Sequence, residues 1–297
     1  MKLAWATDIH LDMCSDDAFE QGLLRQFGDA DAVLLTGDIA NGRSIERWLI
    51  TLSVKLDRPI YFVLGNHDYY HRSIAQVRES VLARCAREPN LFYLSDGSII
   101  DLGEGASLVG HDGWGDAQLG DFLGCMVELN DHRLIEELKT RDREALKPRL
   151  QALGQEAADS LRDAISRAIV RGARRVLVAT HVPPFVESSW YQGKIPEPDS
   201  HWIPNCTCKA TGDVLLELSE QNPGVELTVF CGHTHGAGST RMRDNLLVHT
   251  GGAEYQAPGV AGWIRPNADP ILGGPEDPPE PPKKRSFSLL RWLTGSG

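Results

Sequence analysis

The sequence predicts an α/β protein built on a largely parallel sheet. Three short apolar runs, at residues 2–7, 32–36 and 60–64, have the length and composition of buried strands. Two segments with helical spacing of apolar residues, 17–27 and 44–56, lie between them. This alternation favours parallel pairing, because a helix is the usual crossover between parallel strands.

The second half of the chain continues the alternation with longer connections. A helical stretch is predicted from 130 to 171, with an interruption near Pro148. Residues 183–208 form a connection rich in Pro, Trp and Tyr, and loops of this length are usually functional or disordered. A third helix is predicted at 73–87, and further strands are predicted at 98–102, 107–110, 175–180, 225–231, 241–243 and 246–250, the last two as a hairpin.

The bulk composition is typical of a globular protein from a reducing compartment. The chain has 297 residues, 41% hydrophobic and 24% charged, which is enough to bury a core without disulfide bonds. Its six cysteines show no secreted-type spacing, and Cys206-Thr207-Cys208 lacks a second pair at zinc-finger spacing. The first residues already form the strand that precedes Asp8, so we predict no signal peptide and expect a cytoplasmic protein.

The net charge of the chain and its C-terminal segment indicate which kinds of partner the protein can bind. A net charge of −11 argues against a general nucleic-acid-binding surface. We expect one catalytic domain at 1–265 and an extension at 266–297 that begins as a proline-rich linker. Lys283-Lys284-Arg285 and an apolar stretch follow the linker, a pattern that can make weak contact with a membrane surface or a protein. A disordered end is the default expectation for such a segment.

Five short runs place potential metal ligands directly after predicted strands. Each run alone is typical of turn chemistry, but together they supply carboxylate, amide and imidazole donors, which suit Mn, Fe, Zn or similar ions. Because open α/β sheets bind ligands at the carboxyl ends of their strands, we expect the runs to converge. They are Asp8-Ile9-His10, Gly37-Asp38, Gly65-Asn66-His67-Asp68, His181 and Gly232-His233-Thr234-His235.

In residue type and order, these runs resemble the calcineurin-like metallophosphoesterases over roughly residues 1–252. The resemblance implies the family fold, an α/β two-sheet sandwich flanked by helices in four layers (αββα), and a centre of two divalent metal ions. It also implies phosphoester hydrolysis by a hydroxide that the two ions activate. The implied ligands are Asp8, His10, Asp38 and His235 for one ion and Asp38, Asn66, His181 and His233 for the other, with Asp38 shared.

His67 is expected to act on the substrate and not on a metal ion. Its neighbour Asn66 is an implied ligand, so His67 should project elsewhere along an extended backbone. The resemblance implies that it contacts the phosphate and protonates the leaving oxygen, a role worth about 10²–10⁴ in rate. In the protein phosphatases of the family an aspartate supports this histidine, and here that position is Asn41. An amide can orient the ring but adds no charge, so we expect a lower pKa for His67 than in those enzymes.

Several branches of the family are disfavoured by single positions. The serine/threonine phosphatases carry Gly-Asp-x-x-Asp-Arg-Gly and Gly-Asn-His-Glu, which Asn41 and Asp68 do not match. Purple acid phosphatases have tyrosine at the position of Asn41, and lipid A precursor hydrolases have arginine at that of His67. Double-strand-break nucleases normally add a DNA-binding cap and a basic surface. What remains resembles the broad bacterial group of cyclic-nucleotide-type and uncharacterised phosphoesterases.

Substrate recognition is expected from the segments inserted between motifs. His111 and Trp114 follow a predicted strand and could line the cleft, although a packed loop histidine is the alternative for His111. Trp190, Tyr191 and Trp202 lie in the long connection after His181 and could stack on a base. The alternative is that these aromatic side chains pack within the connection itself.

The sequence as a whole predicts a metallophosphoesterase for a small phosphoester, a nucleotide being one candidate. A phosphodiesterase is preferred to a phosphomonoesterase, because the arginine-bearing motif of the protein phosphatases is absent from the chain. The alternatives are a DNA or RNA nuclease that uses the same site and a catalytically weak interaction scaffold of the same fold.

Overall fold

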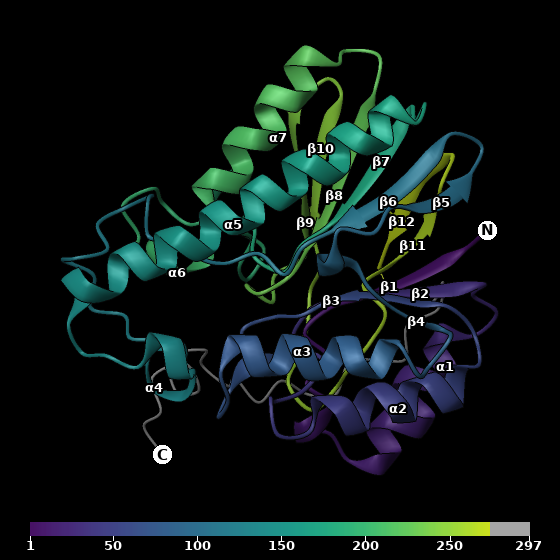
Figure 1. Ribbon diagram of the computed structural model, residues 1–297, viewed down its shortest axis with the longest axis horizontal. Coiled ribbons are helices and arrows are strands. Elements are labelled where there is room, and N and C mark those ends of the chain that lie inside the picture. The colour runs from purple at the N-terminus through teal and green to yellow at the C-terminus, as the bar shows by residue number, and fades with distance from the viewer. Residues whose placement is uncertain (274–297) are drawn as a thin grey trace.

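Two six-stranded sheets pack face to face, and helices cover the outer face of each (Figure 1). The computed structural model describes residues 1–273. Its layers confirm the predicted four-layer αββα sandwich. The linker at 275–282 and the basic and apolar stretch after it lie outside the described residues.

The first sheet has the strand order β12-β11-β1-β2-β3-β4. Four of its strands are parallel, namely β1 (Leu3–Ala6), β2 (Ala32–Thr36), β3 (Ile60–Val63) and β4 (Leu91–Tyr93). Beyond β1 the sheet continues antiparallel with β11 (Gly262–Arg265) and β12 (Ala268–Leu272). Its outer face is covered by α1 (Leu24–Phe27), α2 (Ile45–Leu56) and α3 (Ile74–Cys85), the crossovers that parallel strands require.

The second sheet has the order β5-β6-β7-β8-β10-β9. Its parallel centre consists of β6 (Ala106–Gly110), β7 (Arg175–Ala179), β8 (Glu226–Cys231) and β10 (Leu246–Thr250). The antiparallel edges are β5 (Ile100–Gly103) and β9 (Gly238–Arg243). Two helices cover its outer face, α5 (Arg143–Val170) and α7 (Lys209–Gln221).

The central core lies between the two sheets. Alternate residues of β1 explain why its run is apolar throughout: Leu3 and Trp5 face the second sheet, and Ala4 and Ala6 face the helices. The Trp5 ring meets Phe230 of β8 edge-to-face, with ring centroids 5.0 Å apart. This packing keeps β1 and β8 adjacent, and both strands lead into ligand-bearing turns.

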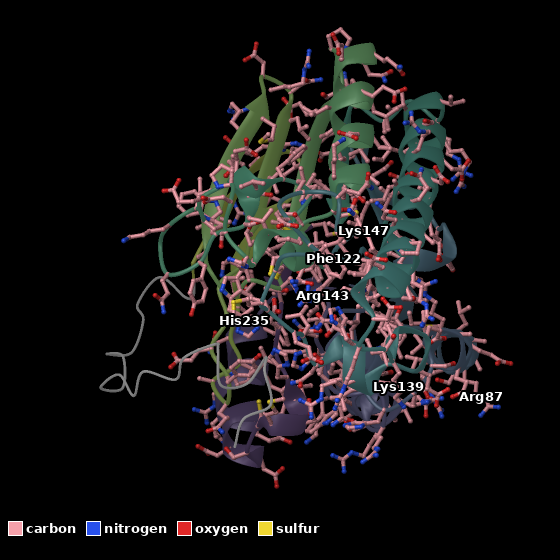
Figure 2. The ribbon with its side chains drawn as sticks, turned by 90° about the vertical axis from the view of Figure 1, so that its left-hand side faces the viewer. Arg87, Phe122, Lys139, Arg143, Lys147 and His235 are labelled. Carbon is pink, nitrogen blue, oxygen red and sulfur yellow. The ribbon has the colours of Figure 1, made fainter. Side chains whose placement is uncertain are left out.

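Two connections pack together beyond the strand ends. One joins β6 to α5 and contains α4 (Asp131–Leu134), and the other joins β7 to α7 and contains α6 (Ile203–Cys206). The backbone N–H of Ala117 donates to the Pro204 carbonyl at 3.0 Å and so links them. Arg143, at the start of α5, donates to the Phe122 carbonyl at 2.7 Å and lies over that ring (Figure 2).

The structure differs from the sequence prediction in several elements. The helix α5 runs through Pro148, and the break in the helical stretch comes earlier, where Asp142 caps α5 by accepting from the N–H groups of Glu144 and Ala145. The strand β12 carries the first sheet past the predicted domain boundary at residue 265. The elements β4, α7 and β11 were not predicted. Within residues 1–273, no helix is both long and apolar enough to cross a membrane.

Candidate functional site

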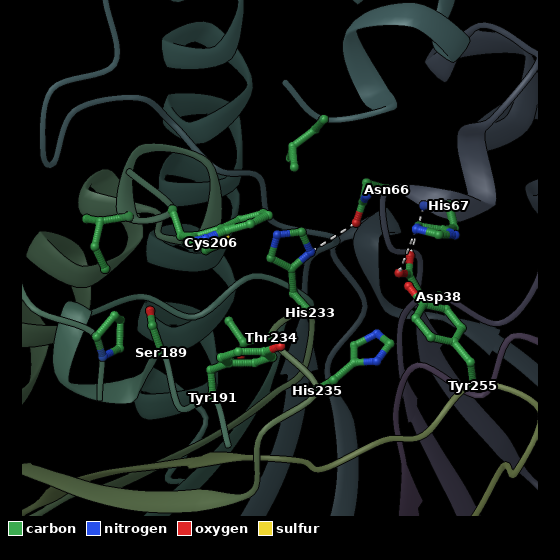
Figure 3. A pocket seen from close by; sticks show the side chains of 14 residues that line it. Asp38, Asn66, His67, Ser189, Tyr191, Cys206, His233, Thr234, His235 and Tyr255 are labelled. Carbon is green, nitrogen blue, oxygen red and sulfur yellow. Dashed lines mark hydrogen bonds and ion pairs between the residues drawn. The ribbon is translucent and has the colours of Figure 1, made fainter. Parts of the chain in front are cut away.

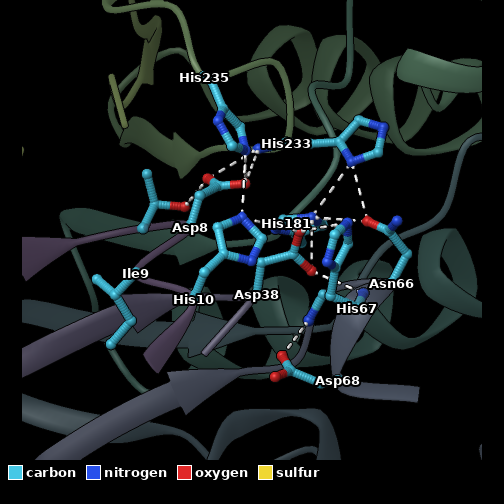
Figure 4. Close-up of polar contacts among 12 residues, drawn as sticks. Asp8, Ile9, His10, Asp38, Asn66, His67, Asp68, His181, His233 and His235 are labelled. Atoms are coloured by element: carbon cyan, nitrogen blue, oxygen red, sulfur yellow. Dashed lines mark hydrogen bonds and ion pairs between the residues drawn. The ribbon is translucent and has the colours of Figure 1, made fainter. Parts of the chain in front are cut away.

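The potential metal ligands meet at one end of the sandwich, where strands of both sheets finish (Figure 4). Parallel strands bring their carboxyl ends to the same edge of a sheet, and this is what gathers ligands that are far apart in the chain. The backbone N–H of His233 donates to the Asp8 carboxylate at 3.0 Å and ties the two sheets together there. Asp8 and His10 follow β1, Asp38 follows β2, Asn66 follows β3, His181 follows β7, and His233 and His235 follow β8.

The turns that carry these ligands have an uncommon backbone. Asp8, His10 and Asp38 have φ angles of 51°, 39° and 50°, and His233 and His235 have φ angles of 68° and 58°. A residue other than glycine in this left-handed region costs roughly 1–3 kcal/mol and persists only where its surroundings hold it. Five such residues at one place indicate a site whose geometry is held by the packing around it.

The glycines that precede two of the ligands are required by close approach. A Cβ atom on Gly65 would lie 2.2 Å from Oδ1 of Asp38, and one on Gly232 would lie 2.2 Å from Oδ2 of Asp8. Both distances are far below van der Waals contact, so any larger residue would displace a carboxylate. This explains why the runs begin Gly-Asn and Gly-His.

One group of ligand atoms gathers around Asp8. Nε2 of His235 lies 3.3 Å from Oδ1 of Asp8, and Nε2 of His10 lies 3.3 Å from Nε2 of His235. Oδ2 of Asp38 is 3.8 Å from Nε2 of His10. Asp8, His10 and His235 form one of the groups in this part of the chain that could hold a metal ion.

A second group gathers around Asn66. Its Oδ1 lies 3.1 Å from Nε2 of His181 and 3.0 Å from Nδ1 of His233. Oδ1 of Asp38 is 3.5 Å from Nε2 of His181. The two oxygens of Asp38 therefore face the two groups.

The chemistry of these donors fits divalent cations. Burial lowers the pKa of His10 and of His233 to about 3, so both imidazoles are neutral, which is the form that binds metals. Burial also raises the pKa of Asp38 well above its usual value, and the Asp8 and Asp68 charges add to the shift. Burial acts on Asp8 in the same direction, but His235, His181 and His10 outweigh it and the net pKa is lowered. Buried carboxylates beside neutral imidazoles favour a bound cation, which removes the penalty of burying negative charge.

Additional hydrogen bonds fix the orientation of the ligand side chains and of the turns that carry them. Nδ1 of His181 lies 2.9 Å from the Thr36 carbonyl, a contact in which the ring donates and leaves Nε2 free as a ligand atom. Thr7 donates its hydroxyl to Oδ2 of Asp8 at 2.6 Å. Asp68 accepts from the backbone N–H groups of Ala40 and Gly65, both at 2.8 Å, and so joins the Asp38 turn to the Asn66 turn.

His67 lies beside the ligand groups with its ring at the cavity wall. Its backbone N–H donates to Oδ1 of Asp38 at 2.8 Å, and its ring packs 4.3 Å from that of Tyr70 and 4.6 Å from that of His10. Burial lowers the pKa of His67 well below its usual value, and nearby histidines, His10 first, lower it further. Asn41 is not among the causes of this shift, so the expected difference from the protein phosphatases stays a prediction.

Asn41 makes its hydrogen bonds away from His67. Its amide donates to Asp12 at 2.8 Å and accepts from the backbone N–H of Arg43 at 3.0 Å and the hydroxyl of Ser44 at 3.2 Å. The support of the His67 ring by Asn41 therefore stays a prediction, and the side chains that the structure places against this ring are Tyr70 and His10.

A cavity of about 780 Å³, measured with its open mouth, extends from the ligands toward the two connections (Figure 3). Away from the ligands its wall is apolar and aromatic. The residues that line it are Asp38, Asn66, His67, Leu129, Ser189, Tyr191, Pro196, Trp202, Ile203, Cys206, His233, Thr234, His235 and Tyr255.

Of the five predicted substrate contacts, Tyr191 and Trp202 are among the residues that line this cavity. His111 is buried, accepts from the Gly113 N–H and faces Glu156, which matches the alternative of a packed loop histidine. Trp114 is buried against Tyr69. Trp190 donates to Thr240, and its ring lies over Gly238.

Sequence reasoning missed two residues near the ligands. Tyr255, in the loop after β10, packs its ring 4.7 Å from those of His10 and His235. Asp131 of α4 is buried and accepts from Nδ2 of Asn66 at 2.8 Å. Neither residue follows a strand directly, so the pattern that revealed the ligands carries no signal for them.

Comparison with known proteins agrees with this geometry. Residues 1–237 match the family model described as calcineurin-like phosphoesterase. No curated protein sequence matches the chain. Two similar solved structures are a phosphopantetheinyl hydrolase from Mycobacterium tuberculosis (14% identity, TM-score 0.58, covering 86% of this chain and 90% of that chain) and a dimetal phosphatase from Danio rerio (15% identity, TM-score 0.55, covering 92% and 95%).

At these identities the two structures establish a common fold, while the family match rests on most of the sequence. The family match, the shared sandwich and the His/Asp groups at its strand ends agree with one another. The chain belongs to the calcineurin-like phosphoesterase family, and it is a phosphoester hydrolase that uses two divalent metal ions.

Proposed function

We propose that this protein is a phosphodiesterase that cleaves a small diester beside the carboxylate of Asp38. The observation that carries the proposal is the position of that carboxylate between two groups of ligand atoms. Its Oδ2 lies 3.8 Å from Nε2 of His10, and its Oδ1 lies 3.5 Å from Nε2 of His181. A carboxylate so placed can serve two ions at once.

In this proposal each ion has four protein ligands. The set contains two carboxylates, while the amide and imidazole ligands are neutral, so two divalent ions would leave the centre with net positive charge that attracts a phosphate. When bound, the ions polarise the phosphoryl oxygens and lower the pKa of bound water toward neutrality. The ligands are Asp8, His10, Asp38 and His235 for one ion and Asp38, Asn66, His181 and His233 for the other.

His67 is proposed as the general acid. Its ring lines the cavity beside the ligands, where it can reach the leaving oxygen of a bound diester. The rings of Tyr70 and His10 both pack against the His67 ring and restrict its motion. The backbone hydrogen bond from His67 to Asp38 holds the acid beside the proposed shared ligand, where it could protonate the leaving oxygen of a diester.

The cavity wall favours a diester over a monoester. Among the described residues that line the cavity there is no lysine or arginine, the side chains that commonly bind the extra charge of a monoester dianion. A diester carries a single negative charge and a second organic group, which the apolar wall near Leu129, Trp202 and Ile203 can bury.

The preference can be measured with two chromogenic substrates. With added manganese, iron or zinc, we expect kcat/KM for bis-p-nitrophenyl phosphate to exceed that for p-nitrophenyl phosphate by at least about tenfold, or about 1.4 kcal/mol. An inverted ratio would make the protein a monoesterase. Release of nucleotides from single- or double-stranded DNA under the same conditions would instead support the nuclease alternative, which an acidic chain disfavours.

The organic group of the substrate is proposed to be a flat ring, such as the base of a nucleotide. Tyr191 and Trp202 both line the cavity, on the side formed by the β7–α7 connection. Stacking of a base on such a ring contributes about 1–3 kcal/mol.

We expect Trp202→Ala to raise KM for cyclic nucleotides about 5- to 150-fold, the factor that corresponds to that stacking energy, and to leave kcat nearly unchanged. The matched control is Trp190→Phe, in the same connection but outside the cavity lining, which should leave both constants unchanged. An unchanged KM in Trp202→Ala would exclude stacking on this residue. The same assay compares nucleotides with sugar phosphates and phospholipid headgroups.

Two further aspects remain proposals. A cytoplasmic location is supported by the six cysteines, all free in the structure. Contact of the C-terminal extension with a membrane or a protein is supported only by its basic and apolar sequence. Sedimentation with liposomes, with and without residues 274–297, would test the second.

A further inference from the structure

A buried carboxylate contacts the Asn66 amide on the side that faces away from the other proposed ligands. Asp131, of which 3% is exposed, lies on α4 in the connection between β6 and α5. Its Oδ1 accepts from Nδ2 of Asn66 at 2.8 Å and from the hydroxyl of Tyr70 at 2.8 Å. Nδ2 of Asn66 also donates to the Tyr70 oxygen at 3.2 Å.

This contact selects one of two orientations of the amide. The oxygen and the nitrogen of an asparagine side chain have nearly the same shape, but only the oxygen can bind a metal ion. An ionised carboxylate only accepts hydrogen bonds, so it fixes the NH₂ group on its own side. The amide oxygen then faces Nε2 of His181 and Nδ1 of His233, the position where a ligand atom is needed.

The same carboxylate also reaches the proposed general acid. The Tyr70 hydroxyl donates to Asp131, and the Tyr70 ring packs against His67 with centroids 4.3 Å apart. Asp131 thus supports two neighbouring residues of the site from a different connection, and it is not itself among the residues that line the cavity.

We propose that Asp131 is a positioning residue that sets Asn66 in its metal-binding orientation and, through Tyr70, supports the ring of His67. The inference rests on the ligand role proposed for Asn66. Residues that orient metal ligands typically change metal affinity or activity 10- to 100-fold when they are replaced, and this sets the size of the expected effect.

The test is manganese binding to the full chain, measured by calorimetry and by metal content. Asp131→Leu removes the hydrogen-bond acceptor at similar side-chain volume and should lower the affinity for one of the two ions about 10- to 100-fold. Asp131→Asn keeps an oxygen that can accept from both Asn66 and Tyr70, so it should retain most of the affinity. If Asp131→Leu does not fold, Asp131→Ser replaces it, because a serine side chain is too short to reach Asn66.

A second substitution separates orientation from general damage. In Asp131→Leu/Asn66→Asp, residue 66 has two equivalent oxygens and needs no partner to choose between them, and the Tyr70 hydroxyl can donate to the one that faces away from the ions. We expect this double variant to regain the second ion. A loss caused by disturbed packing would not be restored in this way.

The matched control is Asp116→Leu. Asp116 is a fully buried carboxylate in the same connection. It accepts from the Ala210 N–H at 2.9 Å and makes no hydrogen bond to a proposed metal ligand among residues 1–273. This variant should lower the melting temperature but keep both ions.

Two results would overturn the inference. One is unchanged binding of both ions in Asp131→Leu, and the other is a loss that Asn66→Asp does not restore and that Asp116→Leu reproduces. The proposed function is tested by a different result from the role of Asp131. If the unsubstituted chain binds two ions but prefers monoesters, the diesterase proposal is wrong while the role of Asp131 stands.

Discussion

Asp38→Asn is expected to lower kcat/KM for phosphodiesters on the order of 10³-fold or more. The two oxygens of Asp38 face different ligand groups. An asparagine keeps one oxygen, so it can serve one group and presents an NH₂ to the other, and it also removes a negative charge. The remaining oxygen can still accept from the His67 N–H, so the fold should survive.

Metal content distinguishes this substitution from damage to a single ligand. His235 lies only in the group around Asp8, so His235→Ala should lose one ion, whereas Asp38→Asn should lower the affinity for both ions. Mass spectrometry of the purified proteins after dialysis against manganese provides the comparison. If Asp38→Asn loses no more metal than His235→Ala, Asp38 does not join the two ions.

His67→Gln is expected to slow hydrolysis about 10²–10⁴-fold when the leaving group is a poor one, such as the ribose oxygen of a cyclic nucleotide. Glutamine can donate a hydrogen bond but cannot transfer a proton to the leaving oxygen. With p-nitrophenolate as the leaving group the loss should be much smaller, because that anion departs without protonation. Steady-state kcat for the two kinds of diester measures the difference.

Metal binding is the control for His67. This residue lies within reach of His10 and Asp38, so the geometry alone also permits a ligand role. A general acid is not a ligand, and His67→Gln should therefore retain both manganese ions. Loss of an ion, or equal slowing of both diesters, would contradict the proposed acid role.

Most of the ligand set was visible in the sequence for a local reason. Each ligand follows a strand within a few residues, and the strand, the turn and the ligand type are properties of one short segment. The Gly-Asn run shows this clearly, because Gly65 is needed where a Cβ would strike Asp38. The alternation of strands and helices likewise predicted the parallel pairing of neighbouring strands, since each crossover is local.

The substrate side of the site was much harder to predict. His111 and Trp114 follow a strand as the ligands do, yet both are buried in packed surroundings. Trp190 and Trp202 look equivalent in the sequence, but only Trp202 belongs to the cavity lining. Whether a side chain faces a cavity or a core depends on what packs against its segment, and the sequence of that segment does not contain this information.

The strand-end motifs, and with them the type of metal chemistry, can be recognised in the sequence because the strand, the turn and the ligand side chain belong to one short segment. The meeting of Asp131 with Asn66, of Tyr255 with His10, and of two connections around one cavity depends on contacts between segments that are distant in the chain. Such contacts arise only when both sheets have packed through Trp5 and Phe230, since that packing sets the distance between the two rows of strand ends.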